Sequence, residues 1–293
     1  MSTDQEDKKA WSEDWEKNDN RSIKDLDEMT YRRQIDFIFA CFNFGIFIDV
    51  GPGVAYSEAW LLRQRLPGCQ IIGLEPQLDR YLSLKMNCYP GQLYHNAVGE
   101  ICGVVKGATG HRAGRSDFKS KYNQESFDSG AYQLTEVNGV SVDYLLSEIA
   151  ENDTQAFIWA DVEGAELSVL KGSVNSLNQQ RICGFLLELE TDLGSQTNPA
   201  YGRGSHWLDT IEWCWSFGFK PVGIFNIQPT HFDCIFAYES GEDPGIDFVP
   251  KEWMDEAVES LGESDSSKHM IFVRAVKYGE MWKAKVTSDG NLR

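Results

Sequence analysis

Short apolar runs alternate along the chain with longer segments in which apolar residues recur every three or four positions. A short apolar run bounded by Gly, Pro or polar residues is typical of a buried strand, and the longer period is typical of an amphipathic helix. The pattern predicts strands at 46–50, 70–74, 92–95, 156–160, 183–189, 219–225 and 233–238. It predicts helices over 31–43, about 78–88 and 140–150, and along the apolar faces that begin at Ala55, Leu167 and Leu208.

Strands that alternate with helices of this length indicate a mostly parallel sheet covered on both faces. Only Asn226–Phe232 joins the last two strands, which is too short for a helical crossover, so these strands are expected to be antiparallel. We therefore expect an α/β fold of three layers, with a seven-stranded, mostly parallel sheet and one antiparallel strand. The Gly-rich stretches 103–130 and 194–205 are expected to be irregular loops. Three parts are expected: an acidic tail over 1–30, one domain over 31–240 and an extension over 241–293.

The first predicted strand runs into Asp49 and then into a turn with Gly51 and Gly53. Two glycines let a ligand approach bare backbone at the carboxyl end of a strand. A nicotinamide-binding turn has a third Gly where Tyr56 stands here. An acid beside the turn suits a ligand with an ammonium and a sulfonium group, which favours S-adenosylmethionine. The alternative is that the glycines serve the geometry of the turn alone.

The second predicted strand ends in the pair Glu75-Pro76. Glu75 follows Gly53 by 22 residues (75 − 53), close to the spacing of about 20 at which an acid binds ribose hydroxyls in dinucleotide folds. A carboxylate can accept hydrogen bonds from both hydroxyls. Glu75 is therefore predicted to bind the cofactor, the alternative being an exposed acid at a strand end.

A third predicted strand leads into Asp161, Glu163 and Glu166. Asp161 and Glu163 would point the same way if the strand continued through them. Carboxylates this close could remove a hydroxyl proton, share a proton or hold a divalent metal. Asp161 is the first catalytic candidate and Glu163 the second, and Asp161 is also a cofactor candidate. Alternatively Glu163 and Glu166 complement a helix N-terminus; Glu188 is a weaker catalytic candidate.

The ordered set of these motifs resembles the FkbM-type methyltransferase family. The matching segments are Asp49–Ala55, Glu75-Pro76, Asn96–Glu100, Asp143–Leu145, Asp161–Glu166 and Leu170–Gly172. The resemblance implies a class I methyltransferase, Rossmann-like fold that binds S-adenosyl-L-methionine and methylates an oxygen, often a hydroxyl of a sugar or small molecule. It adds Asn96 to the cofactor-binding candidates. The chain departs from the family pattern at Gly53, where an Asn is usual, at Ala55, where a Gly is usual, and at Trp159, where a basic residue is common.

The formal net charge of −18 disfavours nucleic acid and anionic membranes as partners, because affinity for phosphates comes largely from Lys and Arg. The basic stretch Lys106–Lys121 is expected to be a solvated loop, or else to meet an anionic partner. A small-molecule or sugar acceptor fits this charge best. Three other functions stay open: a nucleic-acid 2′-O-methyltransferase, a non-catalytic S-adenosylmethionine-binding protein, and a nicotinamide oxidoreductase.

A cytoplasmic protein is the default expectation. Residues 1–20 have no apolar core, so they do not resemble a secretory signal. The longest apolar stretch, Ile35–Val50, is interrupted by polar residues and is too short to cross a bilayer. The seven cysteines form no Cys-x-x-Cys pair, and their apolar neighbours predict buried free thiols. The sequence leaves the metal requirement and the oligomeric state undetermined.

Overall fold

The computed structural model describes residues 25–53, 57–112, 115–119, 132–149, 154–190, 207–225 and 231–238. The expected extension over 241–293, the expected loop over 194–205 and most of the expected tail over 1–30 lie outside these residues.

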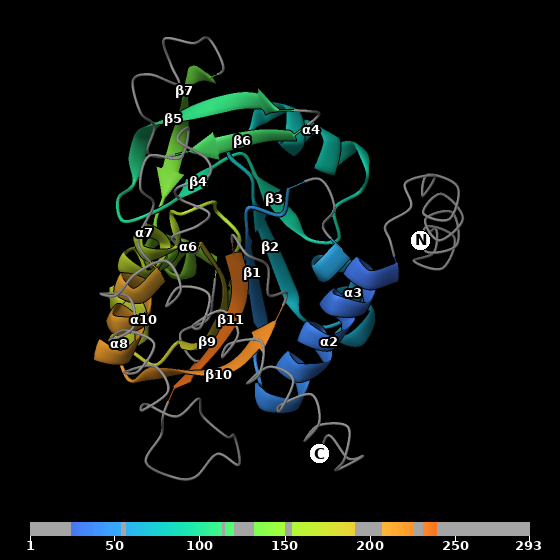
Figure 1. Cartoon of the computed structure of the whole chain (residues 1–293), viewed down its shortest axis with the longest axis vertical. Coiled ribbons are helices and arrows are strands. Elements are labelled where there is room, and N and C mark those ends of the chain that lie inside the picture. Colours follow the sequence, from blue (N-terminus) through green and yellow to red (C-terminus); the bar gives the residue numbers. More distant parts are fainter. Residues whose placement is uncertain are drawn as a thin grey trace, which may run out of the picture.

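Within the described residues, seven strands form one large sheet (Figure 1). In spatial order they are β10 (Phe219–Phe225), β11 (His231–Tyr238), β9 (Ile182–Glu190), β8 (Ala156–Ala160), β1 (Ile46–Val50), β2 (Gln70–Leu74) and β3 (Gln92–Tyr94). β11 is antiparallel to both of its neighbours, and the other pairs are parallel. The prediction of a mostly parallel sheet with one antiparallel strand is confirmed, and that strand lies inside the sheet.

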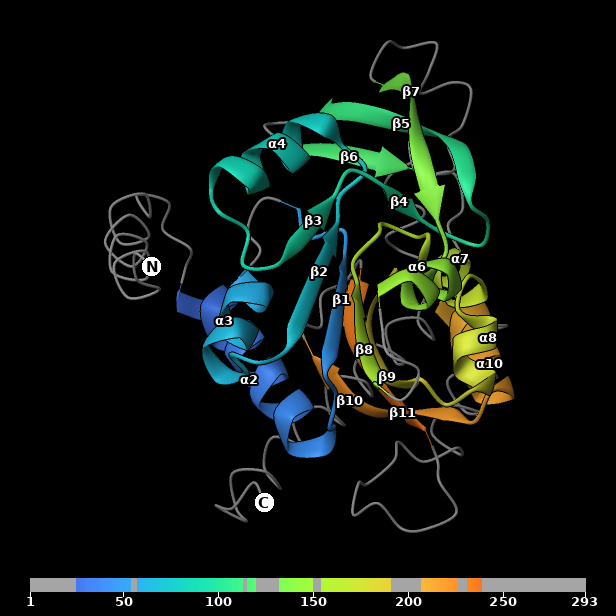
Figure 2. The same ribbon diagram turned by 180° about the vertical axis from the view of Figure 1, so that it is seen from behind.

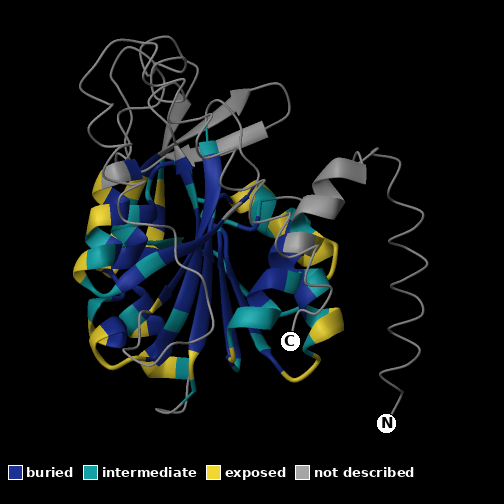
Figure 3. Cartoon of the chain, turned by 60° about the horizontal axis from the view of Figure 1, so that its bottom comes forward, coloured by how far each residue is buried: buried dark blue, intermediate teal, exposed yellow. Residues whose placement is uncertain are grey.

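Helices cover both faces of this sheet, which gives the expected three layers (Figure 2). One layer contains α2 (Asp25–Cys41), α3 (Ser57–Arg65) and α4 (Leu78–Met86); the other contains α6 (Val142–Ile149), α7 (Glu166–Lys171), α8 (Val174–Asn178) and α10 (Trp207–Ser216). Figure 3 shows the buried residues concentrated along the strands, with exposed positions on the outer helix faces. No helix in the described part of the chain has the length and apolarity needed to cross a membrane.

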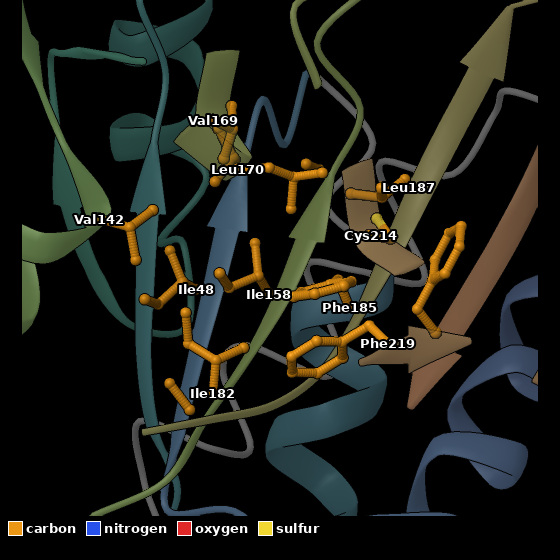
Figure 4. Packing of buried hydrophobic residues seen from close by; sticks show 14 of the residues in the cluster. Ile48, Val142, Ile158, Val169, Leu170, Ile182, Phe185, Leu187, Cys214 and Phe219 are labelled. Carbon is orange, nitrogen blue, oxygen red and sulfur yellow. The ribbon is translucent and has the colours of Figure 1, made fainter. Parts of the chain in front are cut away.

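The central strands are buried on both faces, which explains why they read as continuous apolar runs. Ile46 and Ile48 belong to the core cluster beneath α6, α7 and α10, whereas Phe47 belongs to the cluster beneath α2 and α3. Figure 4 shows the first cluster, in which Ile48, Ile158 and Phe185 pack across three neighbouring strands. Each such buried side chain stabilises the fold by about 1.5–3 kcal/mol.

A second sheet forms where an irregular stretch was expected, so that prediction is wrong over much of 103–130. Its strands are β4 (Ala97–Val98), β7 (Tyr132–Val140), β5 (Gly103–Arg112) and β6 (Arg115–Lys119), in that order. The inward side of β5 and β7 includes Gly107 and Gly139, which are buried, while Val104 is 65% exposed. Because glycines replace apolar side chains at buried positions, the strand period of two is hidden in the sequence.

The predicted helix over 140–150 begins two residues later, because Val140 is the last residue of β7. The helix starts after Ser141, as expected, and the Ser141 hydroxyl accepts the Tyr144 N–H at 3.1 Å.

The predicted helix through Leu167 and Leu177 is divided at Gly172 into α7 and α8. A Cβ at Gly172 would collide with the carbonyl oxygen of Gly99. The Asp143 carboxylate caps the second helix by accepting the N–H groups of Asn175 and Ser176 at 3.0 and 2.8 Å.

All seven cysteines are free thiols, as predicted, but they are not all buried. Cys69, Cys214 and Cys234 are buried, whereas Cys88 and Cys102 are exposed. Cys88 lies in the turn after α4 with a positive φ of 55°, and Cys102 lies just before β5, so apolar neighbours in sequence did not ensure burial there.

Candidate functional site

A cavity of about 330 Å³ lies at the carboxyl ends of β1, β2 and β8. Its wall on the large sheet includes Gly51, Glu75 and Asp161, and its wall on the small sheet includes Val105 and Gly139. The volume falls in the range of small-molecule sites, and the carboxyl edge of a parallel sheet is where open α/β folds bind ligands. Three motifs predicted to bind or react are therefore brought to one cavity.

The glycine turn after β1 is tightly packed. Gly51 and Gly53 have positive φ angles of 80° and 61°, a conformation that favours glycine. A Cβ at Gly51 would collide with the carbonyl oxygen of Asp161, whose N–H donates to the Val50 carbonyl at 3.1 Å. Gly51 lines the cavity, so its backbone is open to a ligand; Gly53 is not among the lining residues.

Asp49 is held away from the cavity. Its side chain is 1% exposed, and Oδ2 accepts a hydrogen bond from the Tyr89 hydroxyl at 2.6 Å. Oδ1 is buried without a hydrogen-bond partner among the described residues. Burial raises the pKa of Asp49 to about 7, and the Tyr89 bond opposes this rise. The structure thus places this predicted cofactor ligand beneath the turn that lines the cavity.

Glu75 lines the cavity, and its side chain is 2% exposed. Its Oε1 accepts the Gln77 N–H at 2.8 Å. Burial raises the pKa of Glu75 to about 7, while the backbone N–H groups of Gln77 and Gly53 and the charge of Arg80 lower it. The interaction with Gly53 links the acid at the end of β2 to the glycine turn at the end of β1.

Asp161 and Glu163 both line the cavity, but the strand does not continue through them, so the condition for their side chains to point the same way is not met. β8 ends at Ala160, and Glu163 has a positive φ of 55°, so the chain turns sharply there. Burial raises the pKa of Asp161 well above its usual range, and the charges of Glu163 and Asp233 add to the rise. Burial and the neighbouring acids therefore favour the protonated form of the Asp161 carboxyl.

Glu166 supports the turn that carries these acids. Its Oε1 accepts the N–H of Gly164 at 3.0 Å and that of Val162 at 3.4 Å. The side chain is 2% exposed, and Gly164 has a positive φ of 92°. For Glu166 these contacts favour the alternative stated above, in which the acid serves the start of a helix, over a role in the reaction.

Asn96, the remaining cofactor candidate, lies at the edge of the site. Its amide donates to the Asn138 carbonyl at 3.1 Å, and the next residue, Ala97, is the first of its segment to line the cavity. Asn96 thereby ties the segment after β3 to β7.

Glu188 belongs to a second acidic group outside the cavity lining. It faces Asp233 in the register of β9 and β11, and the Gln34 amide donates to Asp233 at 2.5 Å. Burial raises the pKa of Glu188 well above its usual range, helped by the charges of Asp161 and Asp233. Two facing acids that share one buried edge keep a proton readily.

Trp159 and His231 are not among the residues that line the cavity. Trp159 is 5% exposed and packs in the core, and His231 is half-buried at the start of β11. Tyr56, Tyr201 and His206 lie outside the described residues. No group of three or more His, Cys, Asp or Glu within the described ranges is arranged to hold a metal ion.

Sequence reasoning missed Arg80 and Tyr89. Arg80 lies in the first turn of α4 and lines the cavity. The one signal for Tyr89 is Gly73, because a glycine within an apolar strand indicates close approach by another group. A Cβ at Gly73 would lie 2.6 Å from the Tyr89 ring.

Comparison with known proteins shows the family directly. The profile of the Methyltransferase FkbM domain matches residues 38–221, and no curated protein matches the chain. Similar solved structures include a TehB-like SAM-dependent methyltransferase from Corynebacterium glutamicum, at 12% identity over 79% of this chain and 97% of that one, with a TM-score of 0.38.

Two further similar structures contain S-adenosylhomocysteine. The N-terminal domain of human METTL16 is 14% identical over 73% of this chain and 70% of that one, with a TM-score of 0.37. M. capricolum TrmK is 8% identical over 86% and 95%, with a TM-score of 0.38. The FkbM profile spans well over half of the chain and includes β1, β2, β8 and their acids, so the protein belongs to the FkbM methyltransferase domain family.

Proposed function

We propose that this protein transfers a methyl group from S-adenosyl-L-methionine to a hydroxyl oxygen of a sugar or small molecule. The observation that carries the proposal is the meeting of Gly51, Glu75 and Asp161 around one cavity at the ends of three adjacent parallel strands. Membership of a methyltransferase family supports the reaction class. The net charge of −18 favours a small acceptor over a nucleic acid.

The cavity residues fit the cofactor in chemistry. Glu75 offers a carboxylate for the two ribose hydroxyls, and the Gly51 backbone leaves room for close approach. Val98 and Val162 supply apolar surface for the adenine ring. The acids Asp161 and Glu163 complement a sulfonium charge. When bound, the cofactor supplies an electrophilic methyl group.

The protein then has to hold the acceptor oxygen in line with that methyl group, because orientation supplies much of the rate in group transfer. We assign Asp161, in its ionised form, the role of receiving the hydroxyl proton, because it lines the cavity. Its burial and its acidic neighbours favour the protonated carboxyl, so it can hold that proton after transfer. Glu163, which lines the same cavity, is the second candidate for this role.

The test is calorimetric titration of the full chain with S-adenosylmethionine and S-adenosylhomocysteine, with NAD as the control ligand. We expect micromolar binding of the adenosyl ligands, weakened at least about tenfold in Glu75→Ala by loss of hydrogen bonds to a charged group. Glu148→Ala is the matched control, because Glu148 is exposed on α6 and does not line the cavity. Binding of NAD alone would replace this proposal with an oxidoreductase.

A screen with S-adenosylmethionine as donor tests the acceptor class. It would compare sugars and small hydroxylated molecules with RNA, and detect S-adenosylhomocysteine as the common product. Turnover with RNA alone would overturn the small-molecule part of the proposal. Cofactor binding without turnover on any acceptor would favour the non-catalytic binding protein.

A further inference from the structure

Arg80 places a positive charge inside the cavity. It is the third residue of α4, its side chain is half-buried, and it lines the cavity. Its Nη1 is the atom nearest to the position that a Cβ would take at Gly53, at 3.9 Å. Its charge also lowers the pKa values of Glu75 and Asp161. The guanidinium therefore lies next to the glycine turn, and its charge is felt by the acids at the ends of β2 and β8.

The cavity walls carry more acidic than basic side chains. The described cavity walls carry four acids, Glu75, Glu100, Asp161 and Glu163, and two cations, Arg80 and Lys106. Lys106 pairs with Glu136 at 3.0 Å across β5 and β7, and both side chains are 59% exposed. Arg80 is thus the cation on the large-sheet side, next to the glycine turn.

The cofactor named above carries one anionic group, the carboxylate of its amino-acid part. The four acids in the cavity walls would repel this carboxylate. A guanidinium binds a carboxylate through two parallel N–H donors, an interaction that a lone backbone amide does not match. We propose that Arg80 binds the carboxylate of the cofactor's amino-acid part, beside the turn at Gly53; this inference rests on the proposed function.

Gly53 is part of the same arrangement. The FkbM-type pattern has an Asn at this position, and here the absence of a side chain leaves the space next to the guanidinium open. The positive φ of 61° at this residue suits Gly and, less readily, Asn. A larger side chain at position 53 would occupy the space next to the Arg80 guanidinium, where the ligand carboxylate is proposed to bind.

The experiment compares two ligands that share the adenosine part. S-adenosylhomocysteine has the amino acid, and 5′-methylthioadenosine lacks both the amine and the carboxylate. We expect Arg80→Met to weaken S-adenosylhomocysteine binding by about 10- to 100-fold, while 5′-methylthioadenosine binding changes by less than about threefold. Lys85→Met is the matched control, because it removes the same charge from an exposed position on the same helix.

Two further variants test whether the loss of S-adenosylhomocysteine binding in Arg80→Met comes from the lost contact rather than from a folding defect. Arg80→Lys keeps the charge and loses the planar pair of donors, so it should fall between the wild type and Arg80→Met for S-adenosylhomocysteine alone. Gly53→Asn should also weaken S-adenosylhomocysteine more than 5′-methylthioadenosine. Each variant is titrated only after its thermal unfolding midpoint has been compared with that of the wild type.

The outcomes separate this inference from the proposed function. Equal weakening of both ligands by Arg80→Met, or no weakening of either, would overturn the role of Arg80 and leave the cofactor assignment intact. Glu75→Ala should weaken both ligands, since both contain the ribose. Failure of the wild type to bind either ligand would overturn the cofactor assignment and this inference together.

Discussion

The hydroxyl of Tyr89 donates a hydrogen bond of 2.6 Å to Oδ2 of Asp49, and both side chains are buried. Tyr89 comes from the segment after α4, and it reaches β1 by crossing Gly73 on β2. Gly73 is the residue opposite Asp49 in the register of the two strands. A glycine on one strand thus opens the path by which a tyrosine holds the acid at the base of the glycine turn.

Removal of this hydrogen bond should destabilise the fold. In Tyr89→Phe, Oδ2 of Asp49 loses its donor while staying buried, so we expect the free energy of unfolding to fall by about 1–3 kcal/mol. Urea denaturation measures the change. Tyr144→Phe removes a hydroxyl that is exposed on α6 and should have little effect. An equal loss in both variants would contradict the importance of the Tyr89–Asp49 contact.

Gly73→Ala should be at least as damaging. The added Cβ would lie 2.6 Å from the Tyr89 ring, so the ring or the strand must shift, at a typical cost of about 1–3 kcal/mol. Gly68→Ala is the control, since nothing lies within 4 Å of a Cβ built there. Thermal unfolding of the two variants should differ clearly, and similar midpoints would show that the Tyr89 ring adapts freely.

The free energy of unfolding should depend on the ionisation of Glu75. Its pKa is about 7 in the folded protein and 4.5 in the reference state, so its proton stabilises the folded form at low pH. That stabilisation is lost as the pH rises from about 4.5 to 7, by roughly 3 kcal/mol at about 1.4 kcal/mol per unit of pKa. Glu75→Gln removes this contribution. Denaturation between pH 5 and 8 should therefore show a steeper decline in the wild type, and parallel curves would refute the raised pKa.

The turn after β8 depends on Glu166. Glu166→Ala leaves the N–H groups of Gly164 and Val162 without their acceptor and should cost about 1–3 kcal/mol. Glu166→Gln keeps an amide oxygen in the same place and should cost clearly less. Denaturant midpoints of both variants measure the difference; an equal loss in the two variants would mean that the charge, which both remove, supports the turn rather than the acceptor oxygen.

Asp161→Asn separates proton transfer from cofactor binding. We expect the methyl-transfer rate on an identified acceptor to fall by about 10²- to 10⁴-fold, with S-adenosylhomocysteine affinity changed much less. Single-turnover rates and calorimetry give the two quantities. Full activity in this variant would end the catalytic assignment and move attention to Glu163.

The sequence predicted most accurately those strands that are buried on both faces. β1, β2 and β8 were predicted with their observed bounds, because strands buried on both faces leave uninterrupted apolar runs. The convergence of Glu75 and Asp161 followed from the parallel topology alone. β5 and β7 were missed because Gly107 and Gly139 stand where apolar side chains would mark a strand.

The features of the site that the sequence did not predict depend on contacts between residues far apart in the chain. The sequence places Asp49 beside the glycine turn, but the tyrosine that holds it comes 40 residues later (89 − 49). The left-handed conformation of Glu163 similarly depends on the turn built by Gly164 and Glu166. Arg80 reaches the cavity through a long side chain, and the pattern of apolar positions on α4 does not report its direction.

The cavity lies between the large sheet and the small sheet. The chain enters the small sheet through the short connection from β3 to β4 and leaves it through the one from β7 to α6. A ligand that fills the cavity touches Gly51 and Glu75 on one side and Val105 and Gly139 on the other, so it acts as a cross-link. Such a cross-link restrains the small sheet without any change in covalent structure. Amide hydrogen exchange in β5 and β7 should then slow when the cavity is filled, although neither strand supplies a reacting group.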